Sequence, residues 1–233
     1  MERREIHIQR NIIENFLMAA KDFVKKNRKL VVYSLLSGIV VLILIISGLV
    51  YYDARESSEV ERFESILDQY RNYSGDSAGK TSMFYVTVSE LDKIVQASSW
   101  GYVAEYGNYV IGNLYFENGK YDKAKEYLLK HADDGSADPF VLLSLQKAAV
   151  ACEYMNNHND AFKIYKKMSE QYGDSIMADQ IYYDLGRMYQ KRNDIYKARE
   201  YYYKVITTYP RSIFSGRAKR RLFLLSYSEK NSK

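Results

Sequence analysis

The most apolar part of the chain is one uninterrupted run near its N-terminus. Residues 30–52 read LVVYSLLSGIVVLILIISGLVYY and contain no charged side chain. A run of about 20 apolar residues is long enough to cross a hydrocarbon core as an α-helix. A water-soluble helix would carry a polar stripe at helical spacing, and only scattered serines interrupt this run. The pattern therefore predicts a transmembrane helix over residues 30–52 in preference to a buried soluble helix.

A cleaved signal peptide is the main alternative for this run. The apolar region of a signal peptide spans about 7–15 residues, follows a short basic region and ends at a small-residue cleavage site. Here 29 residues precede a longer apolar run, which ends in Tyr51, Tyr52 and Asp53. We therefore expect an uncleaved anchor.

Charge on the two flanks predicts the orientation of the anchor. Four basic residues lie within residues 25–29, whereas acidic residues outnumber basic ones in residues 53–64. The positive-inside rule then places residues 1–29 in the cytoplasm and the remainder beyond the membrane. Residues 1–29 are expected to form a basic amphipathic segment, either lying on the inner leaflet or standing as a short solvated helix. Its apolar positions at helical spacing are Ile8, Ile12, Phe16, Ala19 and Phe23.

A second pattern, with large and small positions at fixed offsets, occupies the C-terminal half. Residues 182–210 contain Tyr182-x2-Leu185-Gly186-x2-Tyr189, then Ala198-x3-Tyr202 and finally Pro210. This spacing resembles the tetratricopeptide repeat, a helix–turn–helix hairpin of about 34 residues. The small residues let the paired helices approach closely, and the large ones fill the space between hairpins. Six residues are predicted to pack the helices of the hairpins together: Gly112, Ala124, Ala149, Ala161, Gly186 and Ala198.

The same frame recurs twice upstream at an interval of 37 residues. Gly186 corresponds to Ala149 and Gly112, and the turn residues Gly119, Asn156 and Asn193 fall in phase. Glycine and asparagine tolerate the left-handed backbone that such turns need. Three repeats of period 37 are therefore predicted over residues 105–212.

Weaker patterns assign the flanking segments. Residues 53–104 are expected to hold linking helices, over 56–73 and 88–98, that form a degenerate first hairpin, with a loop at 75–80 and a brief extended stretch at 84–86. Ser89 and Asp92 suggest a helix cap. Residues 213–233 are expected to form a C-terminal capping helix and tail, which shields the last apolar face of a repeat array. The predicted fold class is all-α, with an N-terminal transmembrane helix followed by a tetratricopeptide-like α-solenoid.

Composition argues against nucleic acid as a partner and against catalysis. The net charge is +5, but residues 1–29 carry +4 of it, and the remaining residues balance 26 basic against 25 acidic side chains. No nucleotide-binding or metalloprotease motif is present, and the three histidines lie in different segments. Cys152 falls at a large inward position and is expected to be a buried structural thiol. We expect no catalytic, cofactor-binding or metal-binding residues and no cofactor; the sequence leaves the oligomeric state open.

The first helix of each hairpin offers the predicted partner-binding groove. Offsets in the repeat frame give a largely aromatic and neutral surface with a basic end, suited to an extended or helical polypeptide. The alternative is that these side chains only pack on neighbouring hairpins. The candidate groove residues are Tyr106, Tyr109, Asn113, Phe116, Gln146, Val150, Tyr154, Tyr183, Arg187 and Lys191.

The layout of the whole chain resembles the YfgM family. The phrases NFLMAAKDFVKKNRKL and SSWGYVAEYGNYVIGNLYFENGKYDKAKEYL carry the likeness, which extends over most of residues 12–230. The resemblance implies a bacterial inner-membrane protein with a single span, a cytoplasmic N-terminus and a periplasmic solenoid. It also implies contact with subunits of the Sec translocon and assistance in handing exported chains to chaperones.

One block departs from that family. The third repeat, which ends in TTYPRS at residues 207–212, is closer to repeats of envelope-assembly proteins of the BamD and CpoB types. The competing hypothesis is therefore a tetratricopeptide scaffold in envelope or outer-membrane assembly or in cell division. A membrane-bound enzyme with an unrecognised site is a third and more distant alternative. The expected partners are translocon subunits, exported chains or envelope-assembly proteins.

Overall fold

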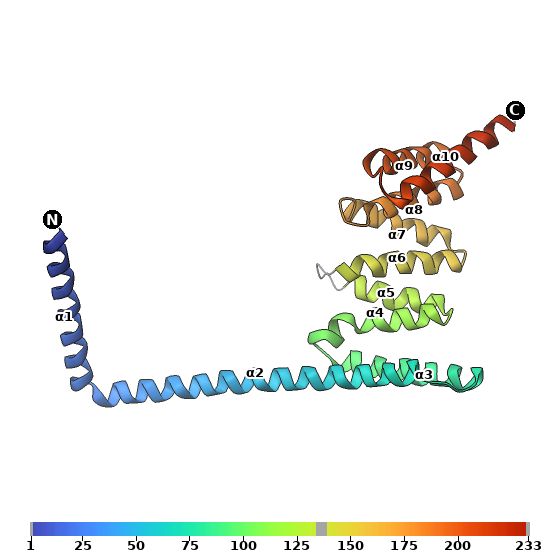
Figure 1. The fold of residues 1–233 in the computed structure, drawn as a ribbon. Helices are drawn as coiled ribbons and strands as arrows, with labels where there is room; N and C mark the ends of the chain where they lie inside the picture. The colour runs from blue at the N-terminus through green and yellow to red at the C-terminus, as the bar shows by residue number, and fades with distance from the viewer. Residues whose placement is uncertain (1, 134–138, 232–233) are drawn as a thin grey trace. The chain divides into compact units, whose positions relative to one another are not determined.

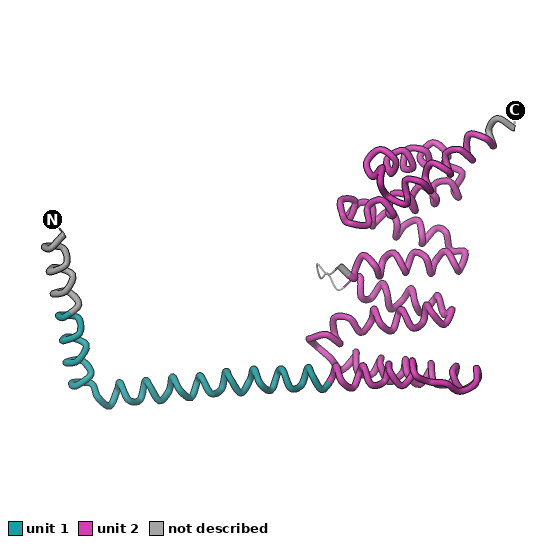
Figure 2. The backbone as a smooth tube through the Cα atoms, in the orientation of Figure 1, with its two compact units in different colours: residues 1–58 teal, residues 59–233 magenta. Residues whose placement is uncertain are grey.

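The chain is helical throughout the part that its structure describes. This computed structural model describes the backbone of residues 2–133 and 139–231 and the side chains of residues 14–133 and 140–227. The chain divides into two compact units, residues 1–58 and residues 59–233 (Figures 1 and 2). The helices are α1 (Glu2–Lys26), α2 (Arg28–Arg71), α3 (Ser77–Ala97), α4 (Gly101–Glu117), α5 (Tyr121–Asp133), α6 (Pro139–Tyr154), α7 (His158–Gln171), α8 (Ala178–Lys191), α9 (Ile195–Thr208) and α10 (Ile213–Asn231).

The apolar run of residues 30–52 lies inside α2. This helix has 44 residues and, within the described part of the chain, is the one helix long and apolar enough to cross a membrane. Its large side chains there are exposed, from Leu30 at 61% to Tyr51 at 68%. Such exposure is costly in water and favourable in lipid. The helix continues without a break past the apolar run, as predicted, and ends at Arg71 rather than at the predicted residue 73.

The N-terminal helix α1 ends immediately before α2. Asn27 separates the two helices, and both its backbone N–H and its side-chain amide donate to the carbonyl of Phe23. Phe16 and Phe23 are exposed on α1. The amphipathic positions proposed at Ile8 and Ile12 lie outside the described side chains.

Residues 101–208 form three helix pairs, joined in order along the chain. The pairs are α4 with α5, α6 with α7, and α8 with α9; each helix also packs on its neighbour in the next pair (Figure 1). The three turns between paired helices contain Gly119, Asn156 and Asn193, with φ of 68°, 57° and 61°. These residues are spaced by 37, so one left-handed turn residue recurs in phase. This confirms the turn positions predicted from the sequence.

Small residues set the distance between the helices of each pair. The six residues predicted to pack there, Gly112, Ala124, Ala149, Ala161, Gly186 and Ala198, are all buried. A Cβ atom added at Gly186 would lie 2.8 Å from Cε1 of Tyr202, and one added at Gly112 would lie 2.7 Å from Cγ of Leu128. Both distances are shorter than real Cβ contacts, so the opposing side chains already occupy that space.

The C-terminal part of α2 pairs with α3, and this further helix pair has its own buried core. Phe63, Leu67, Phe84 and Leu91 are buried in a cluster that also includes α4 and Tyr127 of α5. A second cluster extends from α5 to α10. The core of residues 59–233 therefore consists of two groups of buried side chains, which follow one another along the stack.

The expectation that α3 begins near residue 88 was wrong. The helix begins at Ser77, because the carboxylate of Asp76 caps it by accepting from Gly79 N at 2.8 Å. Residues 84–86 are helical rather than extended, and the predicted loop at 75–80 is reduced to residues 72–76. The cap suggested at Ser89 and Asp92 lies within the helix.

Helix α10 covers the last helix pair. Ala218 and Leu225 are buried, and the ring of Phe214 lies 5.5 Å from that of Tyr183. Phe223, Leu224 and Tyr227 remain exposed on the opposite side of α10. The helix thus shields α8 and α9 as a C-terminal cap does, while its own outer face stays partly apolar.

We expect Gly186→Ala to destabilise the helix pairs by about 1–3 kcal/mol, because its methyl group would overlap the buried ring of Tyr202. Thermal unfolding of the detergent-solubilised chain, followed by circular dichroism, measures this effect. Gly216→Ala is the matched control, since nothing lies within 4 Å of a Cβ placed there. In an open helical position alanine is favoured over glycine, so this control should unfold at an equal or higher temperature. Equal melting temperatures for both variants would contradict the close packing at Gly186.

Candidate partner-binding surface

One side of the first helix in each pair carries the candidate groove residues. The set can be numbered from the small residue of the repeat, at Gly112, Ala149 and Gly186. Side chains six and three residues before it, one residue after it, and four (Phe116) or five (Tyr154, Lys191) residues after it share one side of an α-helix. We call this side of α2, α4, α6 and α8 the first-helix face.

Helix α2 belongs to this face although the sequence analysis did not include it. Its buried residues are spaced as Phe63-x2-Ile66-Leu67-x2-Tyr70, which matches Tyr182-x2-Leu185-Gly186-x2-Tyr189. Leu67 takes the place of the small residue and stands 45 rather than 37 residues before Gly112. The spacing was present in the sequence, but the large residue and the longer interval concealed it.

The N-terminal part of the face on α4 is aromatic. Tyr106 and Tyr109 are half-buried, and their rings lie 5.4 Å and 5.2 Å from that of Phe140 on α6. Both also approach the buried ring of His131, whose Nδ1 is 2.9 Å from Ser144 Oγ. These tyrosines therefore link two helix pairs while keeping part of their surface in solvent.

A second aromatic group lies near the turn ends of α4 and α6. The rings of Tyr121 and Tyr154 stack at 4.6 Å, and Phe116 meets both edge-on. Lys147 places its ammonium 5.4 Å from the centre of the Phe116 ring and donates a hydrogen bond to Asn113. Tyr154 is 60% exposed, so this group offers a rigid aromatic surface.

Helix α6 contributes the most open apolar stripe of the face. Leu143 and Tyr154 are exposed, and Val150 and Gln146 between them are half-buried. Their spacing places them in one line along the helix. A surface of this kind suits a partner that brings apolar side chains.

Tyr183 differs from the other candidate groove residues. It is only 8% exposed, and its ring packs against Tyr202 at 5.9 Å and Phe214 at 5.5 Å. The cap helix α10 covers this position, which the repeat spacing alone does not reveal. Tyr183 is thus part of the packing between α8, α9 and α10 and presents little surface to a partner.

Arg187 is held by carboxylates of the chain itself. Its Nη2 and Nη1 lie 2.6 Å and 2.9 Å from the two oxygens of Glu153, and its Nε lies 3.0 Å from Asp184 Oδ1. Tyr165 donates to Glu153 at 3.1 Å, and Lys191 pairs with it at 3.1 Å. The guanidinium predicted to clamp a partner carboxylate therefore joins α6 to α8 in a network that is largely withdrawn from water.

The surroundings of this network shift the pKa values of its two acids, Glu153 and Asp184. Burial alone would raise the pKa of Glu153, but hydrogen bonds and charge from Arg187 and Lys191 outweigh burial and lower this pKa to about 2. Burial raises the pKa of Asp184, and Arg187 opposes that rise. Glu153 is thus the firmly ionised partner at neutral pH.

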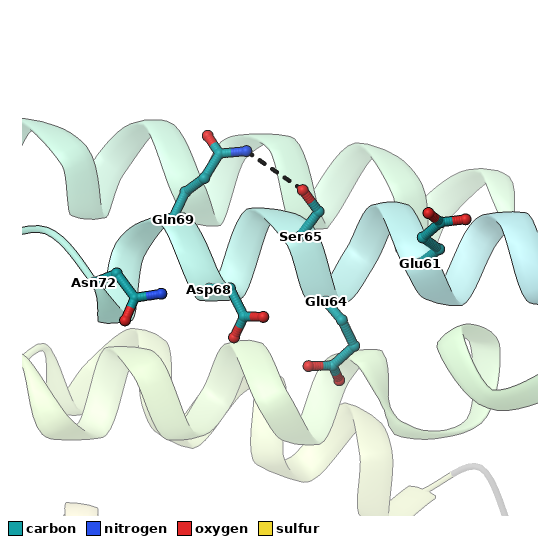
Figure 3. A pocket seen from close by; sticks show the side chains of 6 residues that line it. All are labelled: Glu61, Glu64, Ser65, Asp68, Gln69 and Asn72. Atoms are coloured by element: carbon teal, nitrogen blue, oxygen red, sulfur yellow. Dashed lines mark hydrogen bonds between the residues drawn. The ribbon is translucent and has the colours of Figure 1, made fainter.

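The two ends of the face carry opposite charge. Beside α10, Arg187, Gln190, Lys191 and Arg221 line a hollow of about 190 Å³. On α2, a shallow hollow of about 550 Å³ is bordered by side chains of one stripe, with Gln69 reaching back to Ser65 (Figure 3). The stripe consists of Glu61, Glu64, Ser65, Asp68, Gln69 and Asn72.

The remaining chemistry-bearing residues do not form a reactive centre in the described structure. Cys152 is fully buried, as predicted, and burial raises the pKa of its thiol, which disfavours the reactive thiolate. Among the described residues, no three histidine, cysteine, aspartate or glutamate side chains gather in a way that could hold a metal ion.

The pKa of Glu153 predicts acid sensitivity. Its folded value of about 2 lies below the ordinary value of 4.5, so the unfolded chain binds more protons between these values. The stabilisation from this group is therefore complete above about pH 4.5 and is lost as the pH falls toward 2. We expect Glu153→Gln to lower stability near neutral pH by roughly 1–3 kcal/mol and to flatten the loss of melting temperature on acidification.

Melting curves of both proteins across that pH range test this expectation, and their difference isolates Glu153 from the other acids. Glu170→Gln is the matched control, because Glu170 is 60% exposed and pairs only with Lys166 within its own helix. A Glu153→Gln variant whose acid profile parallels that of the parent would contradict the assignment.

Comparison with known proteins agrees with the repeat architecture. A sequence model of the tetratricopeptide repeat matches residues 107–130 and 179–212, which lie in the first and third helix pairs. No curated protein matches the chain. The chain therefore contains tetratricopeptide repeats, and such repeats indicate a scaffold for protein–protein interaction.

Proposed function

We propose that this chain is a membrane-anchored adaptor that holds a segment of another polypeptide on its first-helix face. The apolar part of α2 is the anchor, and residues 59–233 carry the binding surface beyond the membrane. Acidic residues after the span and basic residues before it support a cytoplasmic N-terminus and a periplasmic repeat unit in a bacterial inner membrane. The proposed role is non-enzymatic.

The exposed stripe of α6 is the observation that carries this proposal. Leu143 is 39% exposed and Tyr154 60% exposed, although the helix they belong to packs on α4, α5 and α7. Apolar side chains left open in line on a packed helix suit a groove for an extended or helical segment. Rigid aromatic rings contribute contact area at a small cost in conformational entropy.

The partner at the membrane is proposed to be the Sec translocon together with chains that emerge from it. This assignment is supported by the resemblance of residues 12–230 to the YfgM family. An adaptor of this kind would keep newly exported chains from aggregating until chaperones receive them. The competing role is a scaffold that binds one dedicated protein of envelope assembly or division.

Photocrosslinking from the face tests both the surface and the partner. A photoreactive residue at Tyr154 should give adducts in intact membranes, identified by mass spectrometry as translocon subunits or a variety of exported chains. The same residue at Tyr203 is the matched control, because it is 57% exposed but lies on the second helix α9. A single envelope-assembly protein at Tyr154 would favour the scaffold role, and equal yields at both positions would contradict the proposed face.

A further inference from the structure

The charge of the side chains on the first-helix face changes progressively from α2 to α8. One residue after the repeat's small position, the side chains are Asp68 on α2, Asn113 on α4, Val150 on α6 and Arg187 on α8. At the position three residues before the small one, α2 also carries an acid, Glu64. The face thus begins acidic and ends basic, and its middle is mostly aromatic and aliphatic, with the ammonium of Lys147 held between Asn113 and the Phe116 ring.

The acidic end carries a net negative charge. Glu61, Glu64 and Asp68 lie on one stripe (Figure 3). Arg71 pairs with it, 3.6 Å from Glu64 and 3.4 Å from Asp68. The side chains of Glu64, Asp68 and Arg71 are each more than 40% exposed. Their ion pairs are therefore weak, and a basic group of a partner can replace Arg71 in them. Three carboxylates against one guanidinium leave about two negative charges facing solvent.

This acidic stripe adjoins the aromatic part of the face. Phe63 and Leu67 of α2 share a buried cluster with Val103 of α4, so the two helices lie together. Burial raises the pKa of Tyr102 at the start of α4, and the charge of Glu64 raises it further. Tyr102 in turn lies 5.2 Å from Tyr106. Carboxylates beside aromatic rings form a favourable environment for an ammonium or guanidinium group.

The opposite end disfavours a cation. Lys191 and Arg221 border the hollow beside α10 together with Arg187, whose charge is balanced by Glu153 and Asp184. Lys191 also pairs with Glu153, so three cations stand against two carboxylates at this end. The remaining excess is positive and favours a carboxylate over a basic side chain. The two ends therefore distinguish the two directions in which a segment can lie.

From this arrangement we infer that the face binds a polypeptide segment in one direction, with its Lys or Arg residues on α2, its apolar residues on α4 and α6, and its acidic residues at α10. The inference rests on the proposed function, because it specifies the partner that the same face takes. Charge complementarity fixes this occupant: a segment of opposite polarity would place like charges together at both ends.

The size of the face sets the length of the segment. Of the four steps from α2 to α10, α4 to α6 and α8 to α10 are direct helix contacts. With about 10 Å for each step, the spacing of packed helices, the face would extend roughly 40 Å. An extended chain advances about 3.3 Å per residue and would cover this distance with about 12 residues. A dodecapeptide is therefore the natural probe.

Selection from a random dodecapeptide library displayed on phage tests the inference with the full chain held in nanodiscs. Peptides enriched on the chain should carry Lys or Arg at one end and Asp or Glu at the other, with apolar residues between. On the triple variant Glu61→Gln, Glu64→Gln and Asp68→Asn the enrichment of basic residues should disappear. A selected peptide should bind this variant about three- to tenfold more weakly than the parent, since each exposed pair contributes modestly.

A variant with the same change in charge provides the control. Glu90→Gln, Glu170→Gln and Glu200→Gln neutralise three exposed acids on the second helices α3, α7 and α9, away from the first-helix face. This control should retain both the affinity and the basic enrichment.

The outcomes separate the inference from the proposed function. Peptides that are enriched on the parent and lost on Tyr154→Ser, but show no charge polarity, would overturn the inference and leave the adaptor function standing. Enrichment unaffected by Tyr154→Ser, or no enrichment at all, would overturn the proposed use of the face itself. Basic residues retained on the α2 triple variant would also overturn the inference.

Discussion

The architecture of residues 101–208 depends on one steric constraint, the close approach of paired helices at a small residue. Gly112 and Gly186 leave no room for a larger side chain, because the side chain of Leu128 and the ring of Tyr202 occupy the space, and Ala149 is fully buried at the equivalent position. One left-handed turn residue per pair then reverses the chain at a constant place. Because both features recur every 37 residues, each pair stacks on the next in the same register. The first helices consequently share one face.

That shared face determines what the protein offers to others. Most polar groups along it are already used between repeats: Lys147 bridges to Asn113, and Arg187 binds Glu153 in a bidentate pair. These pairs connect α4 to α6 and α6 to α8. They therefore contribute to the ordered stacking of the repeats more than to recognition of a partner. The aromatic and aliphatic side chains between them remain open. Binding specificity is then left to the ends, where α2 is acidic and α10 is basic.

The candidate membrane span and the repeat unit share one helix. The apolar run and the buried residues Phe63, Ile66, Leu67 and Tyr70 all belong to α2. The helix that is long enough to span a membrane therefore continues directly into the helix pair that α2 forms with α3. The proposed binding surface begins on this helix, shortly after the apolar run in the sequence, and therefore close to the proposed bilayer along the chain. This continuity suits an adaptor that receives or holds partners at a membrane.

The sequence by itself determined the helical repeats, their period, their turns and the apolar run, because each follows from local spacing: glycine, alanine and asparagine act through sterics that nearby residues decide. It also located the first-helix residues of α4, α6 and α8. Only the tertiary structure decided which of them stay open. Tyr183 is covered by α10, Arg187 is engaged by Glu153, and the acids of α2 join the face, because these depend on helices that are distant in the chain and whose spacing departs from the repeat. The start of α3 at Asp76 was likewise missed, since one capping carboxylate outweighed a glycine-containing stretch that looked like a loop.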